Sequence, residues 1–130
     1  NKQRPMALPD KLPDDPRELA NLGDQFLESG TYDKAVFIYE KVLAKDPQDM
    51  DTYNDMGLAL HYMGRTSEAI SALRKGTQIS PSYQRIWLSL GFILKSSGNN
   101  EEAKIALKKA AEINPQTDVG QEAVNILKTL

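Results

Sequence analysis

Cysteine is absent from this 130-residue chain, and histidine occurs once, at His61. Without cysteine there is no disulfide framework, no thiolate nucleophile and no thiolate metal ligand. A zinc site would have to combine His61 with carboxylates, which is an unusual set of ligands. We therefore expect His61 to be an ordinary surface or groove residue, and we expect no metal site.

The sequence also lacks the residue groupings that catalysis and nucleotide binding need. It shows no recognisable pairing of a nucleophile with a base and no cofactor motif. Its 8 glycines stand singly, whereas a phosphate-binding loop clusters them between a strand and a helix. We therefore expect a protein that is not an enzyme and that takes no cofactor.

Long hydrophobic runs are missing, and neither sign of charge dominates. No stretch of about 18 apolar residues could span a bilayer, and no apolar segment follows a basic start as in a secretory signal. The formal net charge of -2 gives no electrostatic case for binding nucleic acid. We expect a soluble chain that neither inserts into a membrane nor binds nucleic acid, and cytoplasm and periplasm are both compatible with it. Because it begins at Asn1 without an initiator methionine and ends without a helix-stopping residue, we expect a larger parent protein.

What the chain does contain is one spacing that occurs three times. A large apolar residue, a second apolar residue and a glycine follow one another, and the three copies lie 34 residues apart. A repeat of this length is typical of stacked helix pairs, in which each pair buries its apolar face against the next. The copies are Leu19-Leu22-Gly23, Tyr53-Met56-Gly57 and Trp87-Leu90-Gly91.

Each repeat carries the residues that start, stop and pack two helices. A first helix of about 13 residues should end near Gly30, Gly64 or Gly98, because glycine adopts the left-handed conformation that terminates a helix. A proline then closes the second helix, because it disfavours helix in the residue before it. The positions expected to form the structural core of the repeats are Leu19, Leu22, Gly23, Phe26, Ala35, Tyr39, Pro47, Tyr53, Met56, Gly57, Leu60, Ala69, Leu73, Pro81, Trp87, Leu90, Gly91, Leu94, Ala103, Leu107 and Pro115.

This spacing divides the chain into repeats over residues 16–49, 50–83 and 84–117, followed by a helix over 118–130. Asp15 followed by Pro16 is typical of a helix start, and Thr117 or Asp118 should cap the last helix. That helix carries an apolar stripe and should cover the exposed side of the third repeat.

Residues 1–15 are rich in proline and are expected to form an extended arm. Two interpretations stay open. The arm is either a linker, or it docks on a neighbouring surface through Met6, Ala7, Leu8 and Leu12.

At the repeat positions named above, residues 16–117 resemble three consecutive tetratricopeptide repeats. Val42 is bulkier than the alanine usual at its position, and Leu94 replaces the commoner tyrosine. The resemblance implies an all-α fold, a right-handed superhelix (α-solenoid) of three antiparallel helix pairs plus a terminal helix. It is specific for the fold and weak for the partner.

The resemblance also implies a concave groove lined by the first helix of each pair, where repeat positions 2, 5, 6, 9, 12 and 13 project. Mapping those positions gives the partner-binding residues expected here, with Ala20, Glu28 and Ser96 on the same positions. They are Arg17, Asn21, Asp24, Leu27, Asp51, Asn54, Asp55, Leu58, His61, Tyr62, Arg85, Leu88, Ser89, Phe92 and Lys95.

Four of these residues, in the second and third repeats, are large and apolar although the repeat core is already filled by other positions. Leu58, Tyr62, Leu88 and Phe92 therefore suggest the floor of a binding site. The alternative is that the terminal helix or the proline-rich arm covers some of them. If a peptide binds, Tyr62 and Phe92 are the natural anchors.

One subclass of the family clamps the acidic C-terminal tails of chaperones with lysine, asparagine and arginine. The corresponding positions here hold Ala20, Asp24, Asp55, Arg85 and Ser89, of which only Arg85 has a suitable charge. Because the two aspartates would repel a carboxylate, the sequence argues against a chaperone tail as the partner.

The sequence therefore predicts a scaffold or adaptor that binds a peptide or helix of a partner protein. An alternative is a structural self-assembly module that forms homo-oligomers through its repeat ends or its arm. A third hypothesis is that these residues are the targeting part of a larger enzyme.

Overall fold

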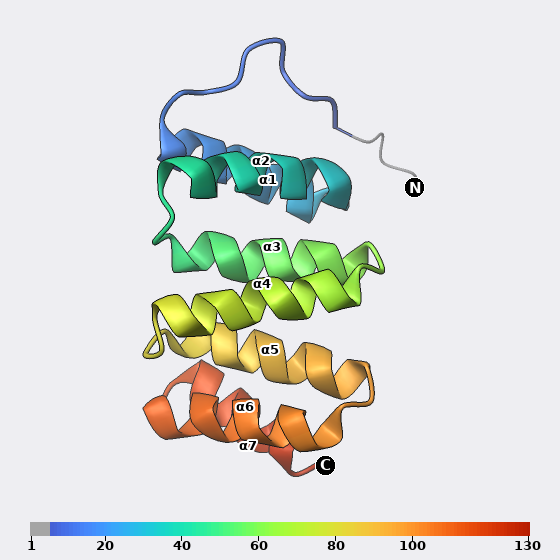
Figure 1. Cartoon of the computed structure of the whole chain (residues 1–130), viewed down its shortest axis with the longest axis vertical. Helices are drawn as coiled ribbons and strands as arrows, with labels where there is room; N and C mark the ends of the chain where they lie inside the picture. The colour runs from blue at the N-terminus through green and yellow to red at the C-terminus, as the bar shows by residue number, and fades with distance from the viewer. Residues whose placement is uncertain (1–5) are drawn as a thin grey trace.

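Helices follow one another in antiparallel pairs along the computed structural model, which describes residues 6–130 (Figure 1). Within those residues there are seven helices and no strand, so the predicted all-α solenoid class is confirmed. The helices are α1 (Pro16–Glu28), α2 (Tyr32–Lys45), α3 (Met50–Tyr62), α4 (Thr66–Ile79), α5 (Gln84–Ser96), α6 (Asn100–Ile113) and α7 (Asp118–Leu127).

Side-chain caps fix the starts of three helices. The Asp15 carboxylate accepts a hydrogen bond from the Arg17 backbone N–H (2.9 Å), and Asp49 accepts one from Thr52 N–H (3.1 Å). Thr117 Oγ1 accepts one from Gly120 N–H at 3.0 Å and so caps α7. The starts of α1, α3, α5 and α7 lie at equal intervals of 34 residues. Hence α7 begins where the first helix of a fourth pair would begin.

The turn inside each pair depends on a glycine. Gly30, Gly64 and Gly98 have positive φ values of 75°, 83° and 84°, a conformation that side chains with a Cβ rarely adopt. The bond that closes the first turn runs from Thr31 N–H to the Phe26 carbonyl (2.8 Å), and the other two turns repeat it. Equal turns give equal helix pairs, which is why the pairs stack regularly.

The two helices of a pair approach closely at a second glycine. A Cβ placed on Gly57 would lie 2.6 Å from Cγ of Leu73, which is fully buried on α4. Gly23 faces Tyr39 and Gly91 faces Leu107 in the same way. The core therefore runs without a break between the first and second helices of all three pairs.

Several residues expected in the core lie closer to solvent than the repeat pattern predicts. Leu22, Met56 and Trp87 are half-buried, and the indole N–H of Trp87 donates to the Pro81 carbonyl (2.8 Å). The residue before Trp87, Ile86, is fully buried. The helix-ending prolines Pro47, Pro81 and Pro115 are exposed, so they shape the backbone and do not fill the core. The other expected core positions are buried.

The described part of the arm lies against the first helix pair (Figure 1). The Lys34 ammonium, on α2, donates to the Met6 carbonyl (2.8 Å), and the side chains of Met6 and Leu12 pack against the core. Ala7 and Leu8 are exposed, so only two of the four expected residues dock. Residues 1–5, which belong to the same predicted arm, lie outside the described residues.

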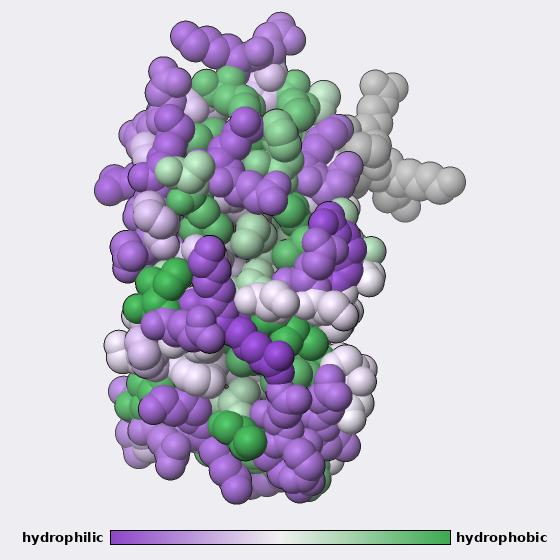
Figure 2. Space-filling model, in the orientation of Figure 1, coloured by the Kyte–Doolittle hydropathy of each residue, from purple (hydrophilic) through white to green (hydrophobic). Residues whose placement is uncertain are grey.

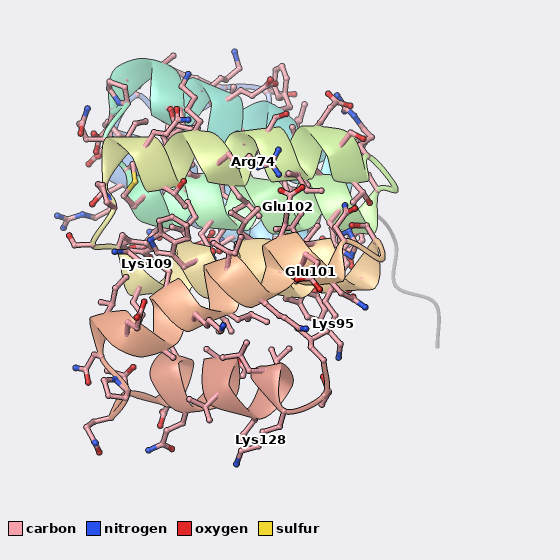
Figure 3. All side chains as sticks on the ribbon, turned by 60° about the horizontal axis from the view of Figure 1, so that its bottom comes forward. Arg74, Lys95, Glu101, Glu102, Lys109 and Lys128 are labelled. Atoms are coloured by element: carbon pink, nitrogen blue, oxygen red, sulfur yellow. The ribbon has the colours of Figure 1, made fainter. Side chains whose placement is uncertain are left out.

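An ion pair joins the second and third helix pairs on the side of their second helices. Arg74 on α4 forms an ion pair with Glu102 on α6, and Figure 3 shows the two side chains between these helices. The space-filling view in Figure 2 shows hydrophobic residues in separate small patches among hydrophilic ones. None of the helices in residues 6–130 has the length and apolar character needed to cross a membrane.

Candidate functional site

The first helices of successive pairs lie side by side and form one face of the stack. Contacts join α1 to α3, α3 to α5, and α5 to α7, so this face is four helices wide. Two cavities open on it, one polar and one apolar. We call this face the groove.

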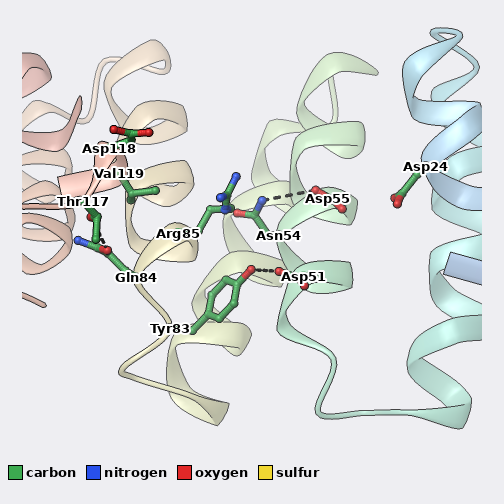
Figure 4. A pocket seen from close by; sticks show the side chains of 10 residues that line it. All are labelled: Asp24, Asp51, Asn54, Asp55, Tyr83, Gln84, Arg85, Thr117, Asp118 and Val119. Atoms are coloured by element: carbon green, nitrogen blue, oxygen red, sulfur yellow. Dashed lines mark hydrogen bonds between the residues drawn. The ribbon is translucent and has the colours of Figure 1, made fainter. Parts of the chain in front are cut away.

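The polar cavity has a volume of about 650 Å³ and draws residues from all four helices (Figure 4). Asp24 comes from α1, Asp55 from α3, Arg85 from α5 and Asp118 from α7. The full lining is Asp24, Asp51, Asn54, Asp55, Tyr83, Gln84, Arg85, Thr117, Asp118 and Val119. Four carboxylates thus share the cavity with one guanidinium.

Two tyrosine hydroxyls hold two of these carboxylates in place. Tyr39, whose ring is buried in the core, donates from its hydroxyl to Asp24 Oδ1 (2.6 Å). Burial, followed by the bond to Asp24, raises the pKa of Tyr39 far above its ordinary value, so its hydroxyl stays protonated. Tyr83 donates to Asp51 in the same manner. Both carboxylates are therefore oriented before any ligand arrives.

The negative charge of Asp55 is unfavourable in this cavity. Burial raises its pKa to about 6, and the negative charges of Asp24 and Asp51 add to the shift. The bond from Asn54 and the nearby Arg85 favour the ionised form but do not cancel the effect. Asp55 consequently gains or loses its proton near pH 6.

Asn54 lies beside Asp55 and is only 3 % exposed. Its amide N–H donates to Asp55 Oδ1 at 3.5 Å, the outer limit of a hydrogen bond. Its carbonyl oxygen Oδ1 is buried and has no hydrogen-bond partner within residues 6–130. Buried polar groups normally form hydrogen bonds. Among the described residues, the Asn54 oxygen therefore lacks the donor that such a group usually has.

The apolar cavity, of about 210 Å³, lies next to the polar one along the groove and is lined by Leu58, Tyr62, Leu88, Ser89, Phe92, Glu122 and Ile126. Tyr62 is 52 % exposed and Phe92 is 40 % exposed, which is unusual for aromatic side chains that lie in one hollow. Tyr32 packs beside Tyr62 with ring centroids 5.3 Å apart, and His61 meets the Phe92 ring edge-on at 6.2 Å. These contacts hold the two exposed rings in position.

The fifteen residues that the sequence predicted for the groove fall into three groups. Ten line the two cavities: Asp24, Asp51, Asn54, Asp55 and Arg85 the polar one, and Leu58, Tyr62, Leu88, Ser89 and Phe92 the apolar one. Arg17 and Asn21 line a separate hollow, together with Ala20, at the start of α1. Leu27, His61 and Lys95 line none of these three hollows.

The residues of the third group have other surroundings. Leu27 packs against the core, and His61 Nδ1 forms a hydrogen bond with Thr66 Oγ1 (3.1 Å). Lys95 is half-buried near the end of α5. Nowhere in residues 6–130 do three histidine or carboxylate side chains gather so that they could hold a metal ion.

The residues that α7 contributes to the groove were not among those predicted from the sequence. Val119 lines the polar cavity, and Glu122 and Ile126 line the apolar one. They stand 34 residues after Arg85, Leu88 and Phe92, so continuing the repeat into the terminal helix would have found them.

The start of α5 holds the beginning of α7 at the groove. Gln84 Nε2 donates to the carbonyls of Ala110 and Asn114 (both 2.7 Å), and Gln84 Oε1 accepts from Thr117 Oγ1 (2.8 Å). Gln84 thereby ties α5 to the turn between α6 and α7. This is why a helix expected only to cover the end of the stack also forms part of the groove.

Two family models match the chain. A model described as tetratricopeptide repeat matches residues 60–128, and one described as TPR repeat matches residues 23–64. The peroxisomal targeting signal receptor of Saccharomyces cerevisiae is 32 % identical over 71 residues, which are 55 % of this chain and 12 % of the receptor. The chain therefore matches only a small part of that relative.

Solved structures with the same fold cover most of the chain. The Yersinia enterocolitica type III secretion chaperone SycD, in complex with a peptide of the translocator YopD, superposes with a TM-score of 0.80 at 20 % identity, over 87 % of this chain and 89 % of that one. The first TPR of Spaghetti (RPAP3), bound to the HSP90 peptide SRMEEVD, gives a TM-score of 0.79 at 22 % identity, over 88 % of each chain. At these identities the likeness is one of fold.

Proposed function

This chain belongs to the tetratricopeptide repeat family, and from that premise we propose that it is a non-catalytic module that binds a peptide or a helical segment of a partner protein in its groove. Two proteins of similar fold are named as complexes with peptides, which supports this class of function. The groove offers what such a ligand needs, namely a concave surface with apolar and polar parts side by side.

The observation that carries the proposal is the exposure of Tyr62 and Phe92 around an apolar cavity. Aromatic side chains that become buried on binding commonly supply much of the binding energy of an interface. Ile126 of α7 lines the same cavity, yet both rings remain accessible. The terminal helix therefore shapes this surface and leaves it open for a ligand.

The charge of the groove argues against an acidic chaperone tail as the ligand. In the polar cavity a carboxylate of the partner would meet Asp24, Asp51 and Asp55, with Arg85 as the single counter-charge. Like charges brought together select against a partner. We propose that partners of this chain do not end in an acidic sequence such as the HSP90 peptide SRMEEVD of the complex named above.

A pair of phenylalanines tests the groove with a matched control. Phe92 in the groove and Phe37 on α2 have nearly the same exposure, 40 % and 43 %, but Phe37 is not among the residues that line the groove. We expect a partner captured from extract of the source cells by the unmodified chain to be retained by Phe37→Glu and lost by Phe92→Glu. Loss of an aromatic anchor should weaken binding by about 30-fold.

Circular dichroism should first establish that both variants are folded. Equal retention of the partner by both variants would contradict the groove as the binding site. In that case self-association would become the leading function, and sedimentation velocity at two protein concentrations would measure it.

A further inference from the structure

We propose that the groove selects partner segments in which a basic side chain, lysine or arginine, enters the polar cavity while an apolar side chain nearby in the partner's sequence enters the apolar cavity. The inference rests on the proposed function of the groove and adds the chemistry of the partner. Three features of the described residues lead to it: an excess of negative charge, an unpaired buried acceptor, and the closeness of the two cavities.

The polar cavity holds more negative charge than its own cation can balance. Asp24, Asp51, Asp55 and Asp118 line it, whereas Arg85 is the only basic side chain in the lining. Arg85 is exposed and forms no ion pair among those found in residues 6–130. A positively charged group from a partner would meet complementary charge at this place.

The buried carbonyl oxygen of Asn54 points to a ligand that donates hydrogen bonds. This oxygen lacks a partner in the described part of the chain, and Asn54 lies among the lining side chains beside Asp55 (Figure 4). An ammonium or a guanidinium carries several N–H donors together with its positive charge, so it could satisfy Asn54 and a neighbouring carboxylate at once. A carboxylate or a purely apolar group would leave the oxygen unpaired.

The carboxylates are also held in position before binding. The hydroxyls of Tyr39 and Tyr83 each donate to one carboxylate, and Tyr39 is anchored in the core. A site whose polar groups are already oriented loses less conformational freedom when a ligand binds. The cavity is thus preorganised for a cation.

The distance between the cavities sets the spacing in the partner. Asp55, Leu58 and Tyr62 all lie on α3, so the polar and apolar contacts are about 5–10 Å apart along that helix at about 1.5 Å per residue. An extended peptide advances about 3.3 Å per residue. The basic and apolar side chains of an extended partner should therefore lie about two to three positions apart.

A phage-displayed library of random twelve-residue peptides, selected on the full chain, tests this inference. We expect enriched peptides to carry lysine or arginine at that spacing from an apolar residue. Binding of a synthetic copy should fall about tenfold in Asp55→Asn and should stay unchanged in Glu101→Gln. Glu101 makes a matched control because its side chain is 91 % exposed on α6, and the substitution removes the same charge.

A double-mutant cycle identifies the direct pair. Replacing the basic residue of the synthetic peptide by glutamine should also cost about tenfold, and combining both changes should cost little more than either alone. Peptides that lose binding in Phe92→Glu but show no basic residue, or that ignore Asp55→Asn, would overturn this inference and leave the groove function intact. A selection that yields no peptide sensitive to Phe92→Glu would overturn the groove function and this inference with it.

Discussion

Asp55 shows at the scale of one residue how a group in the proposed binding site can oppose folding. An ionised carboxyl in this half-buried place has lost much of its water and lies near two other acids, as its raised pKa of about 6 indicates. The ordinary value, which applies to the unfolded chain, is 3.8. The folded protein therefore holds this proton more tightly than the unfolded protein does.

The sign of the pH dependence follows from that difference. Between about pH 4 and pH 6 the folded state binds more protons, so the contribution of Asp55 to stability falls as the pH rises. Asp55→Asn removes the charge and can keep an acceptor for Asn54. We expect it to raise the free energy of unfolding by about 1–2 kcal/mol at pH 7.5, a figure reduced to allow for screening by solvent, and by only a small fraction of that at pH 4.

Urea unfolding followed by circular dichroism at both pH values would measure this gain, with Glu101→Gln as the control. An equal change at the two pH values would show that the effect does not come from ionisation. A gain at neutral pH would also mean that weaker peptide binding by Asp55→Asn cannot be explained by unfolding. Residues placed for function often reduce stability in this way.

At the scale of the helix, α7 depends on one close contact. A Cβ on Gly120 would overlap the carbonyl oxygen of Asn114 and lie 3.0 Å from Cα of Pro115, both of which are backbone atoms that cannot rotate away. Alanine has the higher helix propensity by about 1 kcal/mol, but here the clash should outweigh it. We expect Gly120→Ala to destabilise the protein by about 1–3 kcal/mol and to displace α7.

The exposed Asn125 on the same helix supplies the comparison. Asn125→Ala should change the free energy of unfolding by less than about 0.5 kcal/mol. Chemical denaturation measures both variants. If Gly120→Ala were as stable as Asn125→Ala, then α7 would not pack as closely as described.

The helices were predictable because the residues that start and stop them act locally. Gly30, Gly64 and Gly98 stop the first helices through their own backbone conformation, and the length of the chain between them repeats. The pairing of an individual side chain depends on distant parts of the chain instead. Neither the bond from Tyr39 to Asp24 nor the unpaired oxygen of Asn54 can be predicted from the 34-residue spacing of the repeats. The half-exposure of Trp87 was unpredictable for the same reason.

For the molecule as a whole, each helix pair contacts mainly the pairs beside it. Such stacks open from their ends, because a terminal unit is held on one side only. α7 is ten residues long and contacts α5 and α6, whereas α3 and α4 have a neighbouring pair on each side. We expect amide hydrogen exchange to be slowest in α3 to α6 and fastest in α7 and residues 6–15.

Exchange measured by mass spectrometry on peptic fragments would resolve this gradient. Uniform protection from α1 to α7 would contradict it and would mean that the stack opens as one unit. A bound groove peptide should slow exchange most in α7, because α7 is the terminal helix that lines both cavities.

The four helices that line the groove all run the same way (Figure 1). Their amino ends lie along one edge and their carboxyl ends along the other, and each helix carries a partial positive charge at its amino end and a partial negative charge at its carboxyl end. The two edges of the groove therefore differ electrically whatever side chains they carry. A segment bound in the proposed site would meet unlike edges if it were turned end for end, so we expect the groove to distinguish the direction of a segment that binds there.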